Sequence, residues 1–101
     1  MNSKIKDKNT DDLLNAILCL ENLDECYKFF EDLCTIQELR AMAQRLQVAK
    51  MLSEKHVYSK IVTETGASTA TISRVKRSLD YGCDGYSIVF DRMKNKENND
   101  E

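Results

Sequence analysis

Apolar side chains recur along this chain mainly at every third or fourth position, between residue 13 and residue 93. That spacing places them on one face of a helix, whereas a half-buried strand would alternate apolar and polar residues. The chain of 101 residues has no proline and three glycines, so helices can run without interruption. The pattern therefore predicts an all-α protein.

Capping residues predict where the first three helices begin. Asn or Thr followed three residues later by Glu is the spacing of a capping box, in which each side chain accepts a hydrogen bond from a backbone amide. The predicted starts are Thr10, Asn22 with Glu25, and Thr35 with Glu38. Two aspartates follow Thr10, and the helix dipole favours acids in a first turn. We expect three successive helices here, of which the third extends to about Leu52.

The third predicted helix has two apolar stripes. The broad stripe consists of Ile36, Leu39, Met42, Ala43, Leu46 and Ala49, the narrow stripe of Ala41, Val48 and Leu52, and the polar edge of Gln37, Arg40, Gln44 and Gln47. A helix with two apolar stripes needs packing on two sides, and so short a chain has only a modest core. We therefore expect a second copy of the chain to cover one side, in a homodimer.

Residues 57–79 have the pattern of a helix-turn-helix. A short helix over residues 58–64 ends before Gly66, which can take the left-handed conformation that closes a helix. Ser68 then caps a second helix that extends to about Leu79. Two short helices joined by a tight glycine turn are typical of the helix-turn-helix of DNA-binding proteins.

Positive charge is concentrated in the same part of the chain. The net charge is −2 overall, but it is −5 over residues 1–39, +6 over residues 40–79 and −3 over residues 80–101. A cationic segment on an otherwise acidic protein is typical of a surface that binds a polyanion.

The second helix of this motif has an outward face suited to DNA. Its small side chains allow it to enter the major groove, its cations can reach phosphates, and its first turn can hold a phosphate. The predicted DNA contacts are Lys60, Ser68, Thr69, Ala70, Thr71, Ser73, Arg74, Lys76 and Arg77. The alternative is an interaction module that binds a protein partner rather than DNA. Because a protein-binding face would expose aliphatic or aromatic side chains, this face favours double-stranded DNA.

Two stretches, residues 35–46 and 64–79, resemble the Trp repressor superfamily, and within it the YerC/YecD group of Trp repressor-like proteins. The resemblance extends over roughly residues 11–93. It implies a six-helix fold in an interlocked homodimer, with a last helix over residues 85–93. It also implies a sequence-specific transcriptional regulator, a repressor that occupies a pseudo-palindromic operator.

The resemblance further implies a small-molecule pocket. In Trp repressor, two arginines, a threonine and a serine surround tryptophan, and the matching residues here are Thr35, Arg45, Arg74 and Ser78. The family has a glycine against the indole, where this chain has Val75. A branched side chain there fills the space of the indole. We therefore expect no tryptophan corepressor and no other cofactor.

Other chemistry has little support in the sequence. The four cysteines contain no CxxC pair, so their spacing does not suggest a zinc site. In a reducing compartment we expect them to be buried thiols rather than disulfides. His56 is the single histidine and has no arrangement of acids or thiols around it, so neither a metal site nor an enzyme is expected.

The ends of the chain are polar. They predict flexible tails at residues 1–9 and 94–101, which flank a single domain over residues 10–93. The sequence contains no membrane-spanning run and no signal peptide, so a cytoplasmic location is expected.

Overall fold

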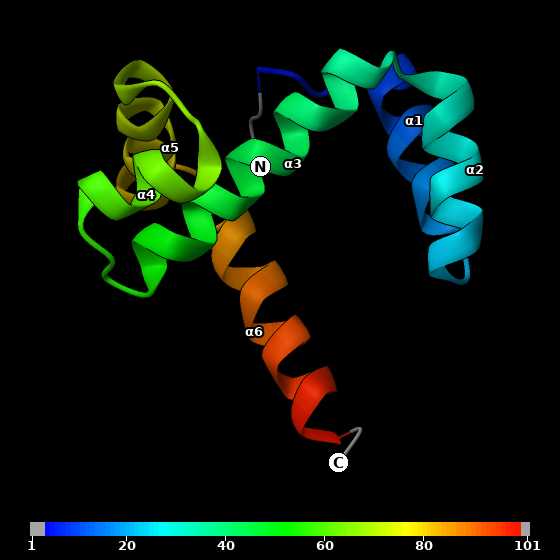
Figure 1. The fold of residues 1–101 in the computed structure, drawn as a ribbon. Coiled ribbons are helices and arrows are strands. Elements are labelled where there is room, and N and C mark those ends of the chain that lie inside the picture. Colours follow the sequence, from blue (N-terminus) through cyan, green and yellow to red (C-terminus); the bar gives the residue numbers. More distant parts are fainter. Residues whose placement is uncertain (1–3, 100–101) are drawn as a thin grey trace. The chain divides into compact units, whose positions relative to one another are not determined.

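In a computed structural model of the protein, residues 4–99 are described, and all of their regular structure is α-helical (Figure 1). The six helices are α1 (Lys8–Leu18), α2 (Leu23–Leu33), α3 (Ile36–Ser53), α4 (Tyr58–Thr65), α5 (Thr69–Tyr81) and α6 (Gly85–Asn99). The all-α prediction is confirmed. None of these described helices is long and apolar enough to cross a membrane.

The chain forms two compact units. The first unit ends at Leu39 and the second begins at Arg40, so the boundary falls inside α3. The sequence predicts a single domain over residues 10–93, and this stays a prediction. Hydrophobic periodicity locates the helices but does not say which of them pack together. The two units are described separately below.

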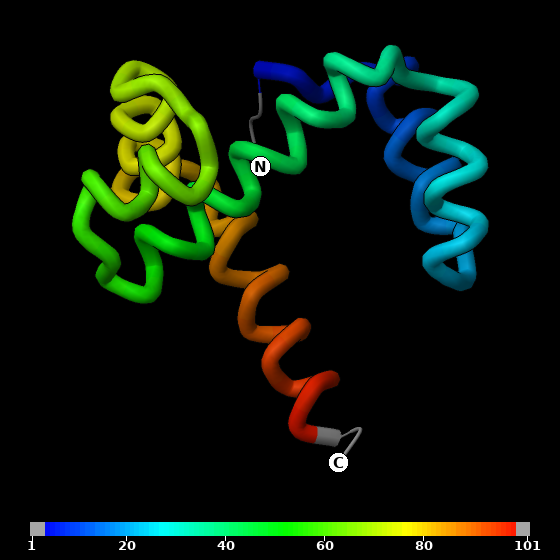
Figure 2. Tube along the Cα trace, in the orientation of Figure 1, coloured from blue at the N-terminus to red at the C-terminus, as the bar shows by residue number. Residues whose placement is uncertain are grey.

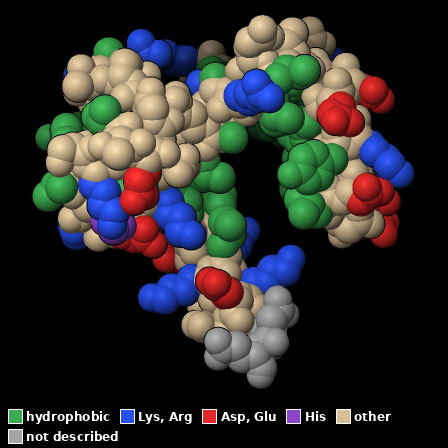
Figure 3. Space-filling view, in the orientation of Figure 1, with side chains coloured by type: hydrophobic (Ala, Val, Ile, Leu, Met, Phe, Trp, Pro, Cys, Tyr) green, Lys and Arg blue, Asp and Glu red, His purple; other side chains and the backbone are tan. Residues whose placement is uncertain are grey.

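The first unit contains a pair of amphipathic helices and has no buried residue among those described. α1 and α2 are joined by residues 19–22 and run in opposite directions (Figure 1). None of residues 4–39 is buried in the single chain, and large apolar side chains such as Leu18 and Leu23 are more than 70% exposed. Figure 3 shows apolar side chains gathered on the surface of this pair. The first unit therefore presents an apolar surface that its own residues do not cover.

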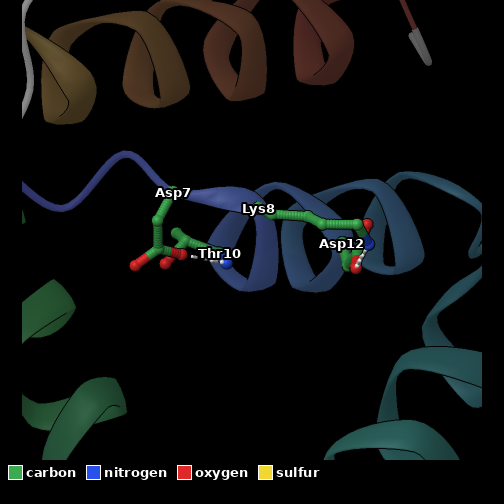
Figure 4. A network of polar contacts seen from close by, with 4 residues as sticks. All are labelled: Asp7, Lys8, Thr10 and Asp12. Carbon is green, nitrogen blue, oxygen red and sulfur yellow. Dashed lines mark hydrogen bonds and ion pairs between the residues drawn. The ribbon is translucent and has the colours of Figure 1, made fainter.

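The first helix begins earlier than its sequence predicts. Asp7 rather than Thr10 is the N-cap: its side chain accepts a hydrogen bond from the Thr10 backbone amide at 2.7 Å (Figure 4). That bond lowers the pKa of the Asp7 carboxyl group. Aspartate caps a helix at least as well as threonine, and an ion pair of 2.9 Å between Lys8 and Asp12 supports the added turn. Residues 8 and 9 of the predicted tail at residues 1–9 are thus helical, and residues 1–3 lie outside the described part.

The other two predicted caps of the first unit are confirmed. The Asn22 side chain accepts from the Glu25 amide at 2.9 Å, and the Glu25 carboxylate reaches the amide of Glu21. At the start of α3 the exchange is reciprocal. The Thr35 hydroxyl accepts from the Glu38 amide at 3.1 Å, and the Glu38 carboxylate accepts from the Thr35 amide at 2.8 Å.

The core of the protein lies in the second unit. Its buried residues are Val48, Ala49 and Met51 of α3, Ile61 of α4, Ala67 of the turn, and Ile72 and Val75 of α5. Partly buried residues pack against them from α3, α5 and α6, including Tyr86 and Phe90, whose rings stack 5.9 Å apart. These contacts hold the two helices of the helix-turn-helix against α3.

Only one side of α3 is used by this core. Met42 and Leu46, on the broad stripe, are 37% and 39% exposed in the single chain, whereas Val48 of the narrow stripe is fully buried, and so is Ala49, the last residue of the broad stripe. The sequence predicts two-sided packing of α3, and the single chain covers one of the two sides.

The last helix is longer than predicted. It extends past Met93 to Asn99, so residues 94–99 are helical rather than a tail. Its lysines and glutamate are good helix formers, its three asparagines are weaker ones, and the stretch has no glycine or proline to end the helix. The remaining two residues of the predicted tail lie outside the described part.

The prediction of buried cysteines is wrong. Cys19 and Cys83 are exposed, Cys26 and Cys34 are half-buried, and all four thiols are free. The first three belong to the unit without an interior, and Cys83 lies between α5 and α6, so none of them reaches the core.

Candidate nucleic-acid interface

The predicted helix-turn-helix is present. α4 ends at Thr65, three residues form the turn, and α5 begins at Thr69, as Figure 2 shows where the tube changes from green to yellow. Gly66 has a φ of +70°, and its amide donates to the Val62 carbonyl at 2.9 Å. A side chain at Gly66 would meet no atom within 4 Å, so glycine is required there by the backbone conformation rather than by space.

A network of hydrogen bonds fixes this turn. The Thr65 hydroxyl donates to the Ile61 carbonyl at 2.7 Å and accepts from the Ala67 amide at 3.1 Å. The side-chain amide of Gln44, on α3, donates to the Thr65 carbonyl at 3.0 Å. The sequence places Gln44 on the polar edge of α3 and gives it no function. Its link to the turn depends on how the helices pack, which periodicity does not reveal.

Side chains at the start of α5 form hydrogen bonds that cap its first turn. Ser68 accepts a hydrogen bond from the Thr71 amide at 3.1 Å, and the two hydroxyls lie 3.1 Å apart. Ser68 is thus the predicted N-cap. The hydroxyls of Ser68 and Thr71, which we expected to hold a phosphate, are engaged with each other in the structure. Thr69, Ala70 and Ser73 are exposed, as major-groove contacts must be.

The predicted cationic contacts are exposed, and they differ in their partners. Lys76 pairs with Asp80 at 3.0 Å, and this hydrogen bond, together with the charge of Asp80, raises the pKa of the lysine. Lys60 is 4.0 Å from Glu64. Within residues 4–99, Arg74 and Arg77 make no ion pair. The two arginines can therefore bind a phosphate without breaking an ion pair, whereas each lysine must first break its ion pair with a carboxylate.

One acid and two tyrosines near the motif have no function in the sequence prediction. Asp80 follows Lys76 by four residues, a spacing at which helix side chains meet, so the sequence did contain that signal. Tyr58 and Tyr81, at the start of α4 and the end of α5, are 44% and 84% exposed, and both lie near enough to Lys76 to add to the rise in its pKa that Asp80 mainly causes. A phenol hydroxyl can donate to a phosphate, so the tyrosines extend the polar edge of this surface.

The four residues of the predicted effector pocket have separate surroundings. Thr35 belongs to the first unit, where it caps α3; its bond to Glu38 lowers the pKa of that carboxyl group. Arg45, Arg74 and Ser78 are exposed residues of the second unit. A pocket formed by all four remains a prediction.

Val75 belongs to the interior of the second unit. Its side chain is 2% exposed and lies in the same core cluster as Val48, Ile61 and Ile72. A surface pocket of this unit lies elsewhere, between the end of α3 and α6, where Lys50, Glu54 and Phe90 are among its lining residues.

Comparison with known proteins shows what the chain is similar to. Residues 8–94 match the Trp repressor protein family. The uncharacterized protein YerC of Bacillus subtilis (strain 168) is 60% identical over 94 residues, which cover 93% of this chain and 90% of YerC.

Two solved structures have the same fold. A TrpR-like protein from Eubacterium eligens ATCC 27750 has a TM-score of 0.88 at 56% identity, covering 92% of this chain and 96% of its own. A candidate Trp repressor from Staphylococcus aureus has a TM-score of 0.87 at 55% identity, covering 90% of this chain and 91% of its own.

Proposed function

Since the chain belongs to the Trp repressor protein family, we propose that it is a sequence-specific DNA-binding regulator that reads its operator with one helix-turn-helix per chain. The observation that carries the proposal is the outward face of α5. Small polar side chains are exposed at Thr69 and Ser73, and two arginines that make no ion pair with residues 4–99 follow on the same helix. Small groups suit the floor of the major groove, and arginines suit phosphates.

We propose that the functional form is a homodimer. The first unit has no buried residue among those described, and one side of α3 stays exposed around Met42 and Leu46. A second copy would bury both surfaces. Two α5 helices related by a two-fold axis would then enter successive major grooves about 34 Å apart on a pseudo-palindromic operator.

We propose that the protein represses transcription by occupying its operator, and that it does so without tryptophan. The core position of Val75 supports this, because the valine fills interior space rather than leaving it open for a ligand. The function is regulatory and requires no catalytic group.

The second candidate is a module whose helix-turn-helix binds a protein. The exposed apolar side chains of α4 favour it: Val57, Tyr58 and Val62 are 66%, 44% and 39% exposed. They lie at and within the first helix of the motif, whereas the face of α5 is polar.

Selection from random DNA duplexes at physiological salt tests the proposal. The expected result is one enriched pseudo-palindromic sequence, which the protein binds about 10³-fold or more tightly than bulk duplex. Selected duplexes without a common sequence would contradict DNA reading and favour the protein-binding candidate. The matched control is the protein with Thr69 and Ser73 replaced by glutamate. Both positions are exposed, so the fold should be kept, but the added carboxylates should be repelled by the negatively charged DNA.

A further inference from the structure

The side-chain amide of Gln44 connects two helices that are distant in sequence. It donates to the Thr65 carbonyl, 21 residues away, at 3.0 Å, and the bond is partly buried. Among the described residues of the second unit, the other side-chain hydrogen bonds join residues at most four apart. This bond therefore does something that the local caps cannot do: it joins the middle of α3 to the turn of the helix-turn-helix.

Both the carbonyl and the hydroxyl of Thr65 form hydrogen bonds in that turn. The Thr65 carbonyl lies at the end of α4, where no further helical turn provides a backbone amide to donate to it. The side-chain amide of Gln44 donates to it instead. The Thr65 hydroxyl accepts from the amide of Ala67, a core residue that is 3% exposed. The position of Ala67 is thus set both by packing and by a chain of two hydrogen bonds that begins on α3.

We propose that Gln44 is a positioning residue for DNA reading: by holding the Thr65 carbonyl, it fixes the angle at which α5 leaves the turn. This proposal rests on the proposed DNA-binding function. Arg77 lies eight residues after Thr69, about 12 Å along a helix. A tilt of about 10° at the turn would move that end by roughly 2 Å, whereas binding groups must be held within about 0.5 Å.

Replacing Gln44 by Glu gives a test that depends on pH. The protonated carboxyl group can donate to the Thr65 carbonyl as the amide does, but the carboxylate cannot and would face an oxygen of like partial charge. Facing an acceptor while partly buried raises the pKa of such a group above the usual value of about 4.3. The bond is therefore present below that raised pKa, which positioning by this bond requires to lie above about pH 5, and it is lost as the pH rises through it.

Gln47→Glu is the matched control. Gln47 lies one turn further along α3, is exposed, and makes no side-chain hydrogen bond within the described residues. It receives the same charge in the same helix, but an exposed carboxyl group keeps a pKa of about 4.3 and is mostly ionised at about pH 5. Both variants and the wild type are measured for affinity to the selected duplex at about pH 5 and pH 8, after circular dichroism has shown that each is folded.

Relative to wild type at the same pH, Gln44→Glu should lose roughly tenfold in affinity at about pH 8 and recover to within about twofold at about pH 5. The loss in Gln47→Glu should be equal at both pH values. If Gln44→Glu shows the same ratio at both pH values, the inference is wrong while the proposed function stands. If the wild type itself selects no duplex, the proposed function is wrong and the inference falls with it.

A second pair of variants tests the other end of the link. Thr65→Ser keeps the hydroxyl that accepts from Ala67, and Thr65→Val removes it at nearly constant volume. Thr65→Ser should bind the selected duplex within about twofold of wild type, and Thr65→Val about fivefold to tenfold more weakly. Equal affinities for the two variants would contradict positioning through the turn.

Discussion

At the scale of single residues, the cations of the candidate interface differ in whether they already form an ion pair. Lys76 is bound to Asp80 on its own helix, whereas Arg74 and Arg77 have no ion pair within the described residues. The ordinary lysine pKa of 10.5 already keeps Lys76 protonated near neutrality, and the pairing raises that pKa further. A phosphate that binds Lys76 must therefore compete with the carboxylate of Asp80.

Asp80→Asn should strengthen binding to every duplex by roughly twofold to fivefold, because it frees the lysine and removes a negative charge beside the DNA. Specificity should not change, since phosphate contacts carry no sequence information. Fluorescence anisotropy with selected and scrambled duplexes measures both. Asp12→Asn is the control, as Asp12 forms the equivalent pair with Lys8 at 2.9 Å on α1. Equal effects of the two substitutions would contradict a special role for Asp80.

The stability of the cap at the start of α3 should depend on pH, and the direction follows from the lowered pKa of Glu38. Hydrogen bonds from Thr35 lower the pKa of Glu38 from 4.5, so the cap stabilises the helix above that pH and is lost as the pH falls through the lowered value. The amide proton of Thr35 should titrate in NMR spectra with a midpoint below 4.5. In Glu38→Gln that titration should disappear. A midpoint at or above 4.5 in the wild type would show that the carboxylate does not accept this bond.

At the scale of elements, starts and turns could be predicted because they depend on neighbours in sequence. Asn22, Thr35 and Ser68 cap helices as expected, and Gly66 closes α4. Asp7 was missed because two acceptable caps lie three residues apart, and propensity alone does not choose between them.

Burial and long-range contacts could not be predicted in the same way. Periodicity identifies the faces of α3, but which face the single chain buries depends on the packing of α4 and α5. The same limit applies to the site: the exposed groups of α5 follow from spacing, whereas the link from Gln44 to Thr65 exists only in the folded unit.

Val75→Gly should destabilise the protein rather than simply open a pocket. It removes a side chain that is 2% exposed and adds glycine inside α5, which together cost about 2–4 kcal/mol. Urea unfolding measures the loss. Val75→Ala, without the backbone effect, should lose about 1 kcal/mol less. A loss below about 1 kcal/mol for Val75→Gly would contradict the core position, and saturable heat from tryptophan titrated into the wild type would contradict its filling role.

At the scale of the whole molecule, the single chain leaves too much apolar surface uncovered. The first unit has no buried residue among those described, and Leu46 and Met42 are exposed on α3. We expect a second copy to cover these surfaces. Folding and dimerisation would then be coupled, because each subunit stabilises the other by mass action.

The midpoint of thermal unfolding should therefore rise with protein concentration. Leu46→Glu should destabilise the protein by several kcal/mol, because a dimer would bury the introduced charge. Gln47→Glu adds the same charge at the next residue, which is exposed and polar in the wild type, and should cost less than about 1 kcal/mol. A midpoint independent of concentration, with equal effects of the two substitutions, would show a folded monomer.

The central claim is that two helix-turn-helix motifs, related by two-fold symmetry, read one operator. Its most direct test is the affinity for the selected duplex when base pairs are inserted between the half-sites. Five inserted base pairs turn one half-site to the opposite side of the DNA, because a helical turn is about 10 base pairs. Affinity should fall to about the level of scrambled duplex, while point changes within one half-site should cost about 1–3 kcal/mol each. Unchanged affinity after the insertion would contradict the claim.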